Sequence, residues 1–370
     1  MKKKHMTNST GKSDYYFGSG PASLPAEVLQ EAAAAIMDYQ RSGLSILSIP
    51  HRGKAFGQIL EEANALVREL CGIGDEFEIL WLQGGGRLQF TMVPMNFLPE
   101  DGVAGYVDSG HWAHEAERAA RYFGQTDIVC SSAGQKYCRL PALPENLNPD
   151  LSYLHITTNN TIYGTQWQAI PRFDVPVVAD MSSDIFSMHR NYSSFSMFYA
   201  CVQKNIGPAG VTMVAVRKDQ LERTVRETPE MLSYTVHAAN KSVLNTPPVF
   251  AIFTSLLMLR WTKKQTVAAL QQESIRKSAA LYEEIEQNSM FTANIAEPAH
   301  RSRMNVCFRT VCSDMEQPFI NKCMEEGITG IEGHRSAGGF RASLYNAVPF
   351  SAVERLVAVM KDFEDQNRKD

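Results

Sequence analysis

Along most of the chain, short apolar runs alternate with longer stretches in which apolar residues recur every three or four positions. The first pattern is typical of a buried strand and the second of an amphipathic helix. Strand-like runs lie at 77–82, 102–107, 127–130, 153–156, 175–179, 197–201 and 211–216, and helical patterns at 26–39, 57–71 and 111–122. Because strands that alternate with helices pair in parallel through helical crossovers, this order predicts an α/β domain with a mostly parallel sheet.

The pattern changes in the last third of the chain. A long helix is expected after Asn245-Thr246-Pro247-Pro248, since proline suits the first turn of a helix, and a second one over 266–287. A strand (305–311), a helix (317–326), a strand (340–344) and a terminal helix (351–366) then form a small α+β unit.

The change of pattern divides the chain into domains. We expect a large domain over 15–270 and a smaller C-terminal α+β domain over 271–370, with the first residues of the large domain packing on the small one as an alternative. Residues 1–14 begin with a basic run and carry no apolar signal core, so a disordered tail is expected there.

Composition argues against several classes of protein. A chain of 370 residues with 44% hydrophobic side chains can bury the core of one large or two ordinary domains. The formal net charge of −4 gives no general attraction to nucleic acid or anionic membranes, and no apolar run is long enough to span a bilayer. Seven cysteines without a Cys-x-x-Cys pair indicate reduced thiols in a cytoplasmic protein, without disulfides or structural zinc. Any anion site must therefore be built locally.

Lys204 stands directly behind the apolar segment 197–202 and Gln203, and a turn rich in glycine and proline follows it. A lysine at the end of a buried strand is costly, because burial disfavours the charged ammonium. Such a lysine is tolerated when it is paired or used covalently, as in a Schiff base with the aldehyde of pyridoxal phosphate. The alternative is a lysine that reaches to solvent from the strand end.

Gly84-Gly85-Gly86-Arg87 lies between a predicted strand and a helical pattern at 88–96. Glycines at such a turn let backbone N–H groups approach a phosphate, and the helix N-terminus adds favourable partial charge. The spacing is neither a dinucleotide fingerprint, since Gln89 replaces the last glycine, nor a Walker A loop. A plain glycine turn remains the alternative.

Two further residues follow predicted strands. Asp180 ends a buried run, where open α/β sheets bind ligands, and could pair with a protonated pyridine nitrogen or simply cap the next helix. Trp112 opens a helix and could stack on a planar ring or belong to the core. His111 and His114 lack the spacing and companions of a metal pair, so we assign no metal.

Two clusters combine arginine and histidine in loops. One is the glycine-rich run that contains His334, Arg335 and Arg341, and the other is His51-Arg52. Guanidinium forks bind carboxylate and phosphate in bidentate fashion, so the clusters suit a small substrate with two or three negative charges. Solvated loop charge is the alternative.

Taken together, these motifs resemble those of the phosphoserine aminotransferases, which are class V, fold-type I pyridoxal phosphate enzymes. The resemblance runs from about residue 16 to the last helix. It rests on His51-Arg52-Gly53-Lys54, Gly84-Gly85-Gly86-Arg87, Gln203 to Gly210, Asn245-Thr246-Pro247-Pro248, and the run from Gly333 to Ser343. The resemblance implies a mostly parallel seven-stranded sheet between helices and a smaller C-terminal domain.

The resemblance also implies a role for each matching residue. Lys204 would form the Schiff base and move the proton, while the cofactor is held by Gly86, Arg87, Trp112, Thr161, Asp180, Gln203, Asn245 and Thr246. Asn245 and Thr246 would come from the partner subunit of a homodimer with shared active sites. The substrate's phosphate and carboxylate would be bound by His334, Arg335 and Arg341, with His51 and Arg52 from the partner.

The implied activity is transfer of the amino group of L-glutamate to 3-phosphohydroxypyruvate, which gives phosphoserine and 2-oxoglutarate in serine biosynthesis. Action on 4-phosphohydroxythreonine in vitamin B6 biosynthesis is left open. Another class V enzyme, such as an alanine–glyoxylate-type transaminase or a cysteine desulfurase, is the alternative. The chain differs from the family pattern at Pro50, Asn160, Tyr163 and Cys201-Val202, around the expected pocket.

Overall fold

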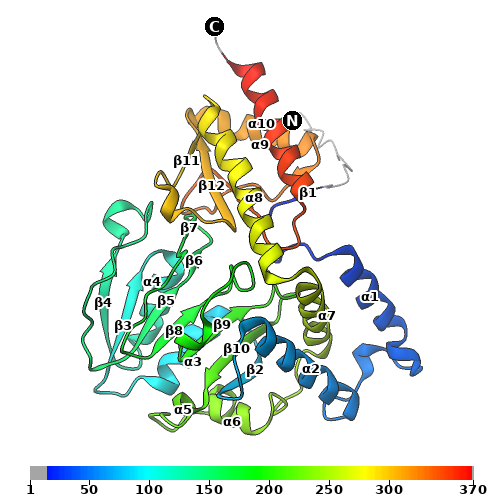
Figure 1. The fold of residues 1–370 in the computed structure, drawn as a ribbon, viewed down its shortest axis with the longest axis vertical. Coiled ribbons are helices and arrows are strands. Elements are labelled where there is room, and N and C mark those ends of the chain that lie inside the picture. The colour runs from blue at the N-terminus through cyan, green and yellow to red at the C-terminus, as the bar shows by residue number, and fades with distance from the viewer. Residues whose placement is uncertain (1–14, 369–370) are drawn as a thin grey trace, which may run out of the picture.

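The computed structural model describes residues 15–368, and the predicted tail over 1–14 lies outside them. Its centre is a seven-stranded sheet in the order β2-β10-β9-β8-β5-β3-β4 (Figure 1). The strands are β2 (Phe77–Gln83), β3 (Val103–Asp108), β4 (Gln125–Ser131), β5 (Leu151–Thr157), β8 (Val177–Asp180), β9 (Met197–Cys201) and β10 (Val211–Arg217).

Only β10 runs against its neighbours β2 and β9, and the other pairs in this sheet are parallel. The predicted mostly parallel seven-stranded sheet is therefore confirmed. Each of the seven predicted strands falls on an observed one with ends that differ by at most a few residues. The shared direction matters for function, because it brings the carboxyl ends of six strands to one edge.

Helices cover both faces of this sheet. One face packs against α1 (Ala26–Met37), α2 (Lys54–Cys71) and α7 (Val249–Gln265), and the other against α3 (Gly86–Phe97), α4 (His111–Ala120) and α6 (Tyr234–Ala239). In α2 the buried residues Phe56, Ile59, Ala63 and Val67 recur at intervals of three and four, which places them on one face. The short helix α5 (Lys218–Leu221) follows β10.

A second apolar cluster forms the core of the C-terminal part. It lies between the antiparallel sheet β11-β12-β14 and the helices beside it. The elements are α8 (Val267–Gln287), β11 (Phe291–Ala293), β12 (Asn305–Thr310), α9 (Glu316–Glu325), β14 (Phe340–Ser343) and α10 (Phe350–Asn367). We call residues 288–368 and the C-terminal half of α8 the small domain. The predicted division near residue 270 stays a prediction, because α8 passes that position without a break.

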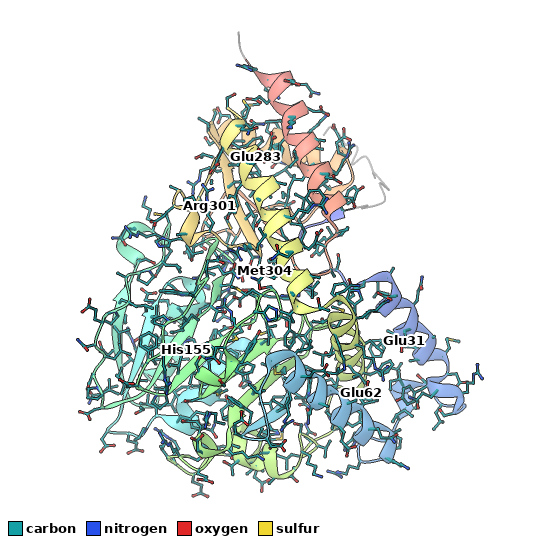
Figure 2. The ribbon with its side chains drawn as sticks, viewed as in Figure 1. Glu31, Glu62, His155, Glu283, Arg301 and Met304 are labelled. Carbon is teal, nitrogen blue, oxygen red and sulfur yellow. The ribbon has the colours of Figure 1, made fainter. Side chains whose placement is uncertain are left out.

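The N-terminal segment belongs to this second core. Strand β1 (Tyr15–Tyr16) pairs in parallel with β13 (Ile328–Thr329), and Phe17 is fully buried in the same cluster. Met304 lies where the small domain meets the large sheet, while His155 lies inside that sheet (Figure 2). No helix within residues 15–368 has the length and apolar character needed to cross a membrane.

Candidate active site

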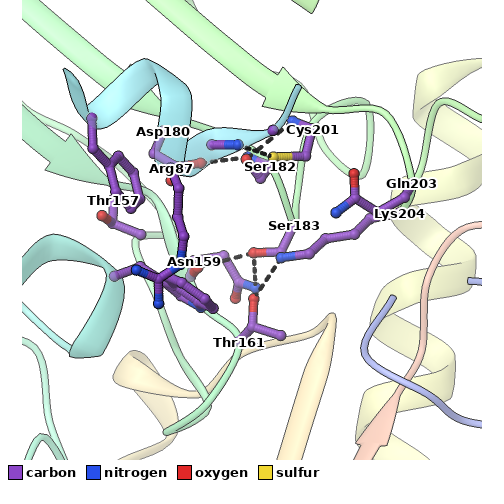
Figure 3. Close-up of a pocket in the computed structure, with 14 residues that line it drawn as sticks. Arg87, Thr157, Asn159, Thr161, Asp180, Ser182, Ser183, Cys201, Gln203 and Lys204 are labelled. Atoms are coloured by element: carbon purple, nitrogen blue, oxygen red, sulfur yellow. Dashed lines mark hydrogen bonds between the residues drawn. The ribbon is translucent and has the colours of Figure 1, made fainter. Parts of the chain in front are cut away.

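A cavity of about 400 Å³ opens at the carboxyl edge of the large sheet (Figure 3). Seven residues predicted to bind the cofactor line it together: Gly86, Arg87, Trp112, Thr161, Asp180, Gln203 and Lys204. They come from segments up to 118 positions apart in sequence, between Gly86 and Lys204. The parallel strands explain the convergence, because each strand delivers the residues that follow it to the same edge.

Lys204 follows β9 in a tight turn in which the N–H groups of Ile206 and Gly207 donate to the carbonyl of Val202. Its side chain is half-buried and points to Thr161 across the cavity (Figure 3). Lys204 Nζ donates to Thr161 Oγ1 at 3.0 Å. The amine is thus held at a defined place in the cavity wall, and no acidic side chain of residues 15–368 forms an ion pair with it, which suits a covalent role.

Asp180 ends β8 and is buried beside Thr157, which pairs with it across the sheet. Burial raises the pKa of Asp180, while hydrogen bonds from Ser182 and the charge of Lys204 oppose the rise. The Ser182 N–H donates to Asp180 Oδ1 at 2.9 Å, but residues 181–190 form turns, so the alternative that Asp180 caps a helix is wrong. Among residues 15–368 no ion pair neutralises this carboxylate. A protonated ring nitrogen in the cavity would stabilise it.

The glycine turn forms another part of the cavity wall. Gly84 has a left-handed φ of +99° and turns the chain from β2 into α3, whose first residue is Gly86. The first N–H groups of a helix lack acceptors inside the helix, so they can donate to a phosphate. The Gly86 N–H donates to Cys201 Sγ at 2.8 Å, and a Cβ at Gly86 would lie 3.2 Å from that sulfur.

Trp112 and Arg87 lie together beside this turn. The Arg87 guanidinium is 5.3 Å from the centre of the Trp112 ring and bonds to Glu115 at 2.9 Å. The Arg87 side chain therefore contacts Trp112 and Glu115 while it lines the cavity (Figure 3). The predicted contact of the Arg87 main chain with the cofactor phosphate stays a prediction.

His334, Arg335 and Arg341 lie close to one another, although none of them lines the cavity itself. The His334 ring lies 5.9 Å from the His111 ring, which in turn contacts Trp112. Burial lowers the pKa of His334, and the nearby charges of Arg341, His111 and Arg335 lower it further. Arg341 is only 8% exposed, and its Nε finds no acceptor among the described residues. A buried guanidinium without an acid partner favours binding of an external anion.

The other four predicted residues lie away from this cavity. His51 and Arg52 line a separate depression, and Asn245 lines another. They are nevertheless neighbours, because Arg52 Nη2 donates to the Leu244 carbonyl at 3.4 Å and Gln83 Nε2 donates to the Thr246 carbonyl at 2.6 Å. We call His51, Arg52, Asn245 and Thr246 the outer patch. The predicted contribution of these four residues to a partner's site stays a prediction.

Several lining residues were not predicted from the sequence: Phe90, Thr157, Asn159, Ser182, Ser183 and Cys201. Thr157 and Cys201 end β5 and β9, so the strand-end rule that selected Asp180 could have found them. Asn159 lies on β6 (Asn159–Asn160), which forms a short hairpin with β7 (Thr165–Gln166). Strands of two residues leave no pattern in the sequence.

Known proteins share both the sequence and the fold. The family model "Aminotransferase class-V" matches residues 14–356. A phosphoserine aminotransferase of Bacillus cereus is 42% identical over 357 residues, which are 96% of this chain and 99% of that protein. The structure of the phosphoserine aminotransferase from Bacillus circulans subsp. alkalophilus superimposes with a TM-score of 0.92 at 40% identity, over 95% and 98% of the two chains.

A third relative is a phosphoserine aminotransferase from Trichomonas vaginalis, whose structure contains bound pyridoxal phosphate. It has a TM-score of 0.87 at 34% identity and covers 93% of this chain and 99% of its own. The chain therefore belongs to the class-V aminotransferases, which use pyridoxal phosphate to transfer amino groups. The cavity fits that cofactor, because it combines a free lysine amine, a buried unpaired carboxylate and a glycine cradle at a helix N-terminus.

Proposed function

We propose that the chain is a phosphoserine:2-oxoglutarate aminotransferase that transfers the amino group of L-glutamate to 3-phosphohydroxypyruvate in serine biosynthesis. The buried, unpaired guanidinium of Arg341 beside His334 carries this proposal. A substrate with one carboxylate and a small apolar side chain needs less positive charge than Arg335 and Arg341 supply. The phosphate and carboxylate of phosphoserine match that charge.

In the reaction, the bound cofactor supplies an electron sink for the carbanion that forms at the substrate Cα. Lys204 Nζ would hold the cofactor's aldehyde carbon and, once released, carry the proton from the substrate Cα. Asp180 would keep the ring nitrogen protonated, and Thr161 would hold the ring hydroxyl. Gly86 and Gln203 would hold the phosphate, and Trp112 would stack on the ring.

We further propose a homodimer in which each cavity is completed by the partner's outer patch. Arg52, Asn245 and Thr246 are exposed, although the resemblance assigns them to phosphate binding. Near this patch in the sequence, Met37, Leu44 and Leu47 expose apolar surface on and after α1, which stands at the edge of the molecule (Figure 1). Exposed apolar side chains are typical of an oligomer interface. A cytoplasmic location stays a prediction.

The test is a panel of half-reactions, in which the absorbance of the bound cofactor is followed as phosphoserine, serine, alanine or 4-phosphohydroxythreonine is added. We expect phosphoserine to convert the cofactor at concentrations at least 100-fold lower than serine or alanine, because the unphosphorylated compounds leave the cationic residues unpaired. Lys204→Ala is the control, in which none of the four should complete the conversion at a comparable rate.

The panel also separates the alternatives. Equal conversion by alanine and phosphoserine would replace the proposal by an alanine–glyoxylate-type transaminase. The response to 4-phosphohydroxythreonine decides whether the second phosphorylated substrate is used. A protein that acquires no cofactor absorbance with added pyridoxal phosphate would contradict the enzyme assignment as a whole.

A further inference from the structure

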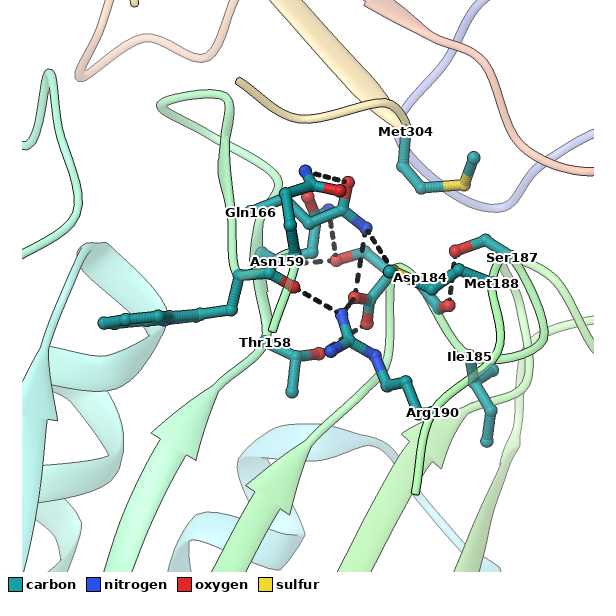
Figure 4. Close-up of polar contacts among 12 residues, drawn as sticks. Thr158, Asn159, Gln166, Asp184, Ile185, Ser187, Met188, Arg190 and Met304 are labelled. Carbon is teal, nitrogen blue, oxygen red and sulfur yellow. Dashed lines mark hydrogen bonds and ion pairs between the residues drawn. The ribbon is translucent and has the colours of Figure 1, made fainter. Parts of the chain in front are cut away.

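A buried polar cluster joins the cofactor cavity to the small domain (Figure 4). Thr161, which contacts Lys204, lies in the β6–β7 hairpin, and one side of this hairpin lines the cavity. Its other side meets the small-domain segment 301–305. The Ser302 N–H donates to the Gly164 carbonyl at 2.8 Å, and Thr165 forms a β-bridge with Arg301. The hairpin is therefore held between the cavity and the small domain.

The centre of the contact is a pair of asparagines. Asn159 Nδ2 donates to Asn305 Oδ1 at 2.7 Å and to Ser183 Oγ at 2.8 Å, while Ser302 Oγ donates to Asn159 Oδ1 at 2.6 Å. Asn159 and Asn305 are 2% and 0% exposed. Water cannot replace these bonds without entering the core, so loss of one partner leaves a buried amide unsatisfied.

Asn305 also fixes the strand that carries Arg341. Its Nδ2 donates to Ser343 Oγ at 3.1 Å and to Tyr345 Oη at 3.3 Å. Asn305 pairs with Ser343 and Cys307 pairs with Arg341 in the register of β12 and β14. Because side chains two positions apart share one face of a strand, Arg341 lies on the same face as Ser343. One side chain thus reaches both the hairpin of Thr161 and the strand of Arg341.

The hairpin fits closely against β12. Gly164 has a φ of +90°, and a Cβ there would lie 3.1 Å from the Asn305 carbonyl oxygen. On the neighbouring strand of the hairpin, Gln166 Nε2 donates to Asp184 at 3.2 Å and its Oε1 accepts from the Arg303 N–H at 2.9 Å. Asp184 forms a buried ion pair with Arg190 at 2.6 Å (Figure 4). Both strands of the hairpin are therefore anchored by polar bonds.

We propose that Asn305, which does not line the cavity, is a positioning residue that sets the cofactor-binding hairpin and the substrate-binding strand relative to each other. Through Asn159 it holds Thr161 and the Lys204 amine, and through Ser343 it holds Arg341. The part of the proposal that concerns cofactor binding (the cofactor half) depends on the hairpin contacts alone. The substrate half rests on the proposed function, since it assumes that Arg341 binds the substrate.

The test compares Asn305→Leu with Asn288→Leu. Asn288 is a buried asparagine of the small domain that bonds to Glu284 at 2.9 Å and to the Met360 carbonyl at 3.1 Å, far from the hairpin. Both variants lose buried hydrogen bonds, so both should lower the melting temperature. Only Asn305→Leu should weaken pyridoxal phosphate binding to the apoenzyme, by about tenfold, and raise KM for phosphoserine by a similar factor.

Two milder variants separate the two halves and cover the case in which Asn305→Leu does not fold. Ser343→Ala removes one bond on the substrate side, so KM for phosphoserine should rise a few-fold while the dissociation constant for the cofactor is unchanged. Asn305→Asp keeps the acceptor for Asn159 and should bind the cofactor more tightly than Asn305→Leu.

The inference is overturned if Asn305→Leu binds the cofactor as the wild type does. It is also overturned if Asn288→Leu weakens binding as much, because the effect would then be general loss of stability. If only Asn305→Leu fails to fold, unchanged KM in Ser343→Ala overturns the part of the proposal that concerns the substrate. Cofactor binding that is about tenfold weaker in Asn305→Asp than in Asn288→Leu then overturns the part that concerns the cofactor, because Asn305→Asp keeps the acceptor for Asn159. If the wild type binds the cofactor but phosphoserine does not convert it, the proposed substrate is wrong. The part of the inference that concerns cofactor binding is then unaffected.

Discussion

Cys201 places a sulfur atom at the start of the phosphate cradle. Its Sγ accepts the Gly86 N–H, the group that the cofactor's phosphate is expected to use. Burial, followed by the charge of Asp180, raises the pKa of the Cys201 thiol, so the sulfur stays neutral and is a weak acceptor. Cofactor binding must then exchange an N–H···S bond for an N–H···O bond to phosphate.

We expect Cys201→Ala to bind pyridoxal phosphate about 2- to 10-fold more tightly than the wild type, because no sulfur then competes for the Gly86 N–H and one net hydrogen bond corresponds to about 0.5–1.5 kcal/mol. The measurement is a titration of the apoenzyme followed by cofactor absorbance. Cys138→Ala is the matched control, since Cys138 is exposed and does not line this cavity. Weaker binding by Cys201→Ala would mean instead that the sulfur supports the cradle.

Residues at strand ends were the part of the site that the sequence could predict. Asp180 and Lys204 follow apolar runs whose direction is set by the α/β pattern, so their common position follows from the fold class. Asn159 and Asn305 gave no such signal. They are 146 positions apart and meet only through the packing of two domains, which no local pattern encodes.

Strand β5 carries a histidine in the middle of the large sheet. His155 is 1% exposed, its Nε2 is 2.9 Å from Tyr199 Oη, and its ring stacks on Tyr106 at 5.3 Å. Burial lowers the pKa of His155 to about 3, since no acid compensates for the lost hydration. The folded protein therefore keeps this histidine neutral.

The burial of His155 makes the free energy of unfolding depend on pH. In the unfolded chain His155 has an ordinary pKa near 6.5, so its contribution to stability is complete above that pH. As the pH falls from about 6.5 towards 3, His155 becomes protonated in the unfolded chain but stays neutral in the folded protein. The free energy of unfolding therefore drops by about 1.4 kcal/mol per pH unit over this range. His155→Gln should lack this part of the slope.

The check is the urea midpoint of wild type and His155→Gln at pH 7 and pH 5. The wild type should lose more stability over this interval, by about 2 kcal/mol, because the interval covers about 1.5 pH units below 6.5. His189→Gln serves as control, since His189 is exposed. Parallel losses in all three proteins would show that His155 titrates alike in both states.

Among the secondary-structure elements, the predictions were best for long ones. The predicted helix over 266–287 is observed at Val267–Gln287, and the terminal helix over 351–366 at Phe350–Asn367. Helix α2 begins at Lys54 and not at 57, because Gly57 is accommodated inside the helix. The short strands β1, β6, β7 and β13 were missed, since two residues are too few to show alternation.

For the molecule as a whole, the proposed dimer makes a prediction about mixed subunits. Co-expression of Lys204→Ala with Arg52→Ala should produce mixed dimers in which one site has both Lys204 and the partner's Arg52. With random pairing about a quarter of wild-type activity returns, because half of the dimers are mixed and each has one intact site. Each variant alone should have much lower activity.

The matched control co-expresses Lys204→Ala with Arg335→Ala. Lys204 and Arg335 are expected to serve the same cavity of one subunit, so no mixed dimer can contain an intact site. If activity returned in this control but not in the co-expression with Arg52→Ala, the outer patch would belong to the site of its own subunit. That result would contradict the proposed exchange of residues between subunits.

The small-domain core also constrains when the protein can fold during synthesis. Phe17, near the beginning of the chain, shares one apolar cluster with Met360 and Phe363 near its end. Ribosomes add about 5–20 residues per second, so on the order of tens of seconds pass between the synthesis of Phe17 and that of its partners near the C-terminus. Until α10 leaves the ribosome, the apolar surface of β1 and β12 is exposed to chaperones and to other nascent chains. A message cut short before α10 would therefore yield a large domain with an unfinished neighbour, which is a target for proteolysis.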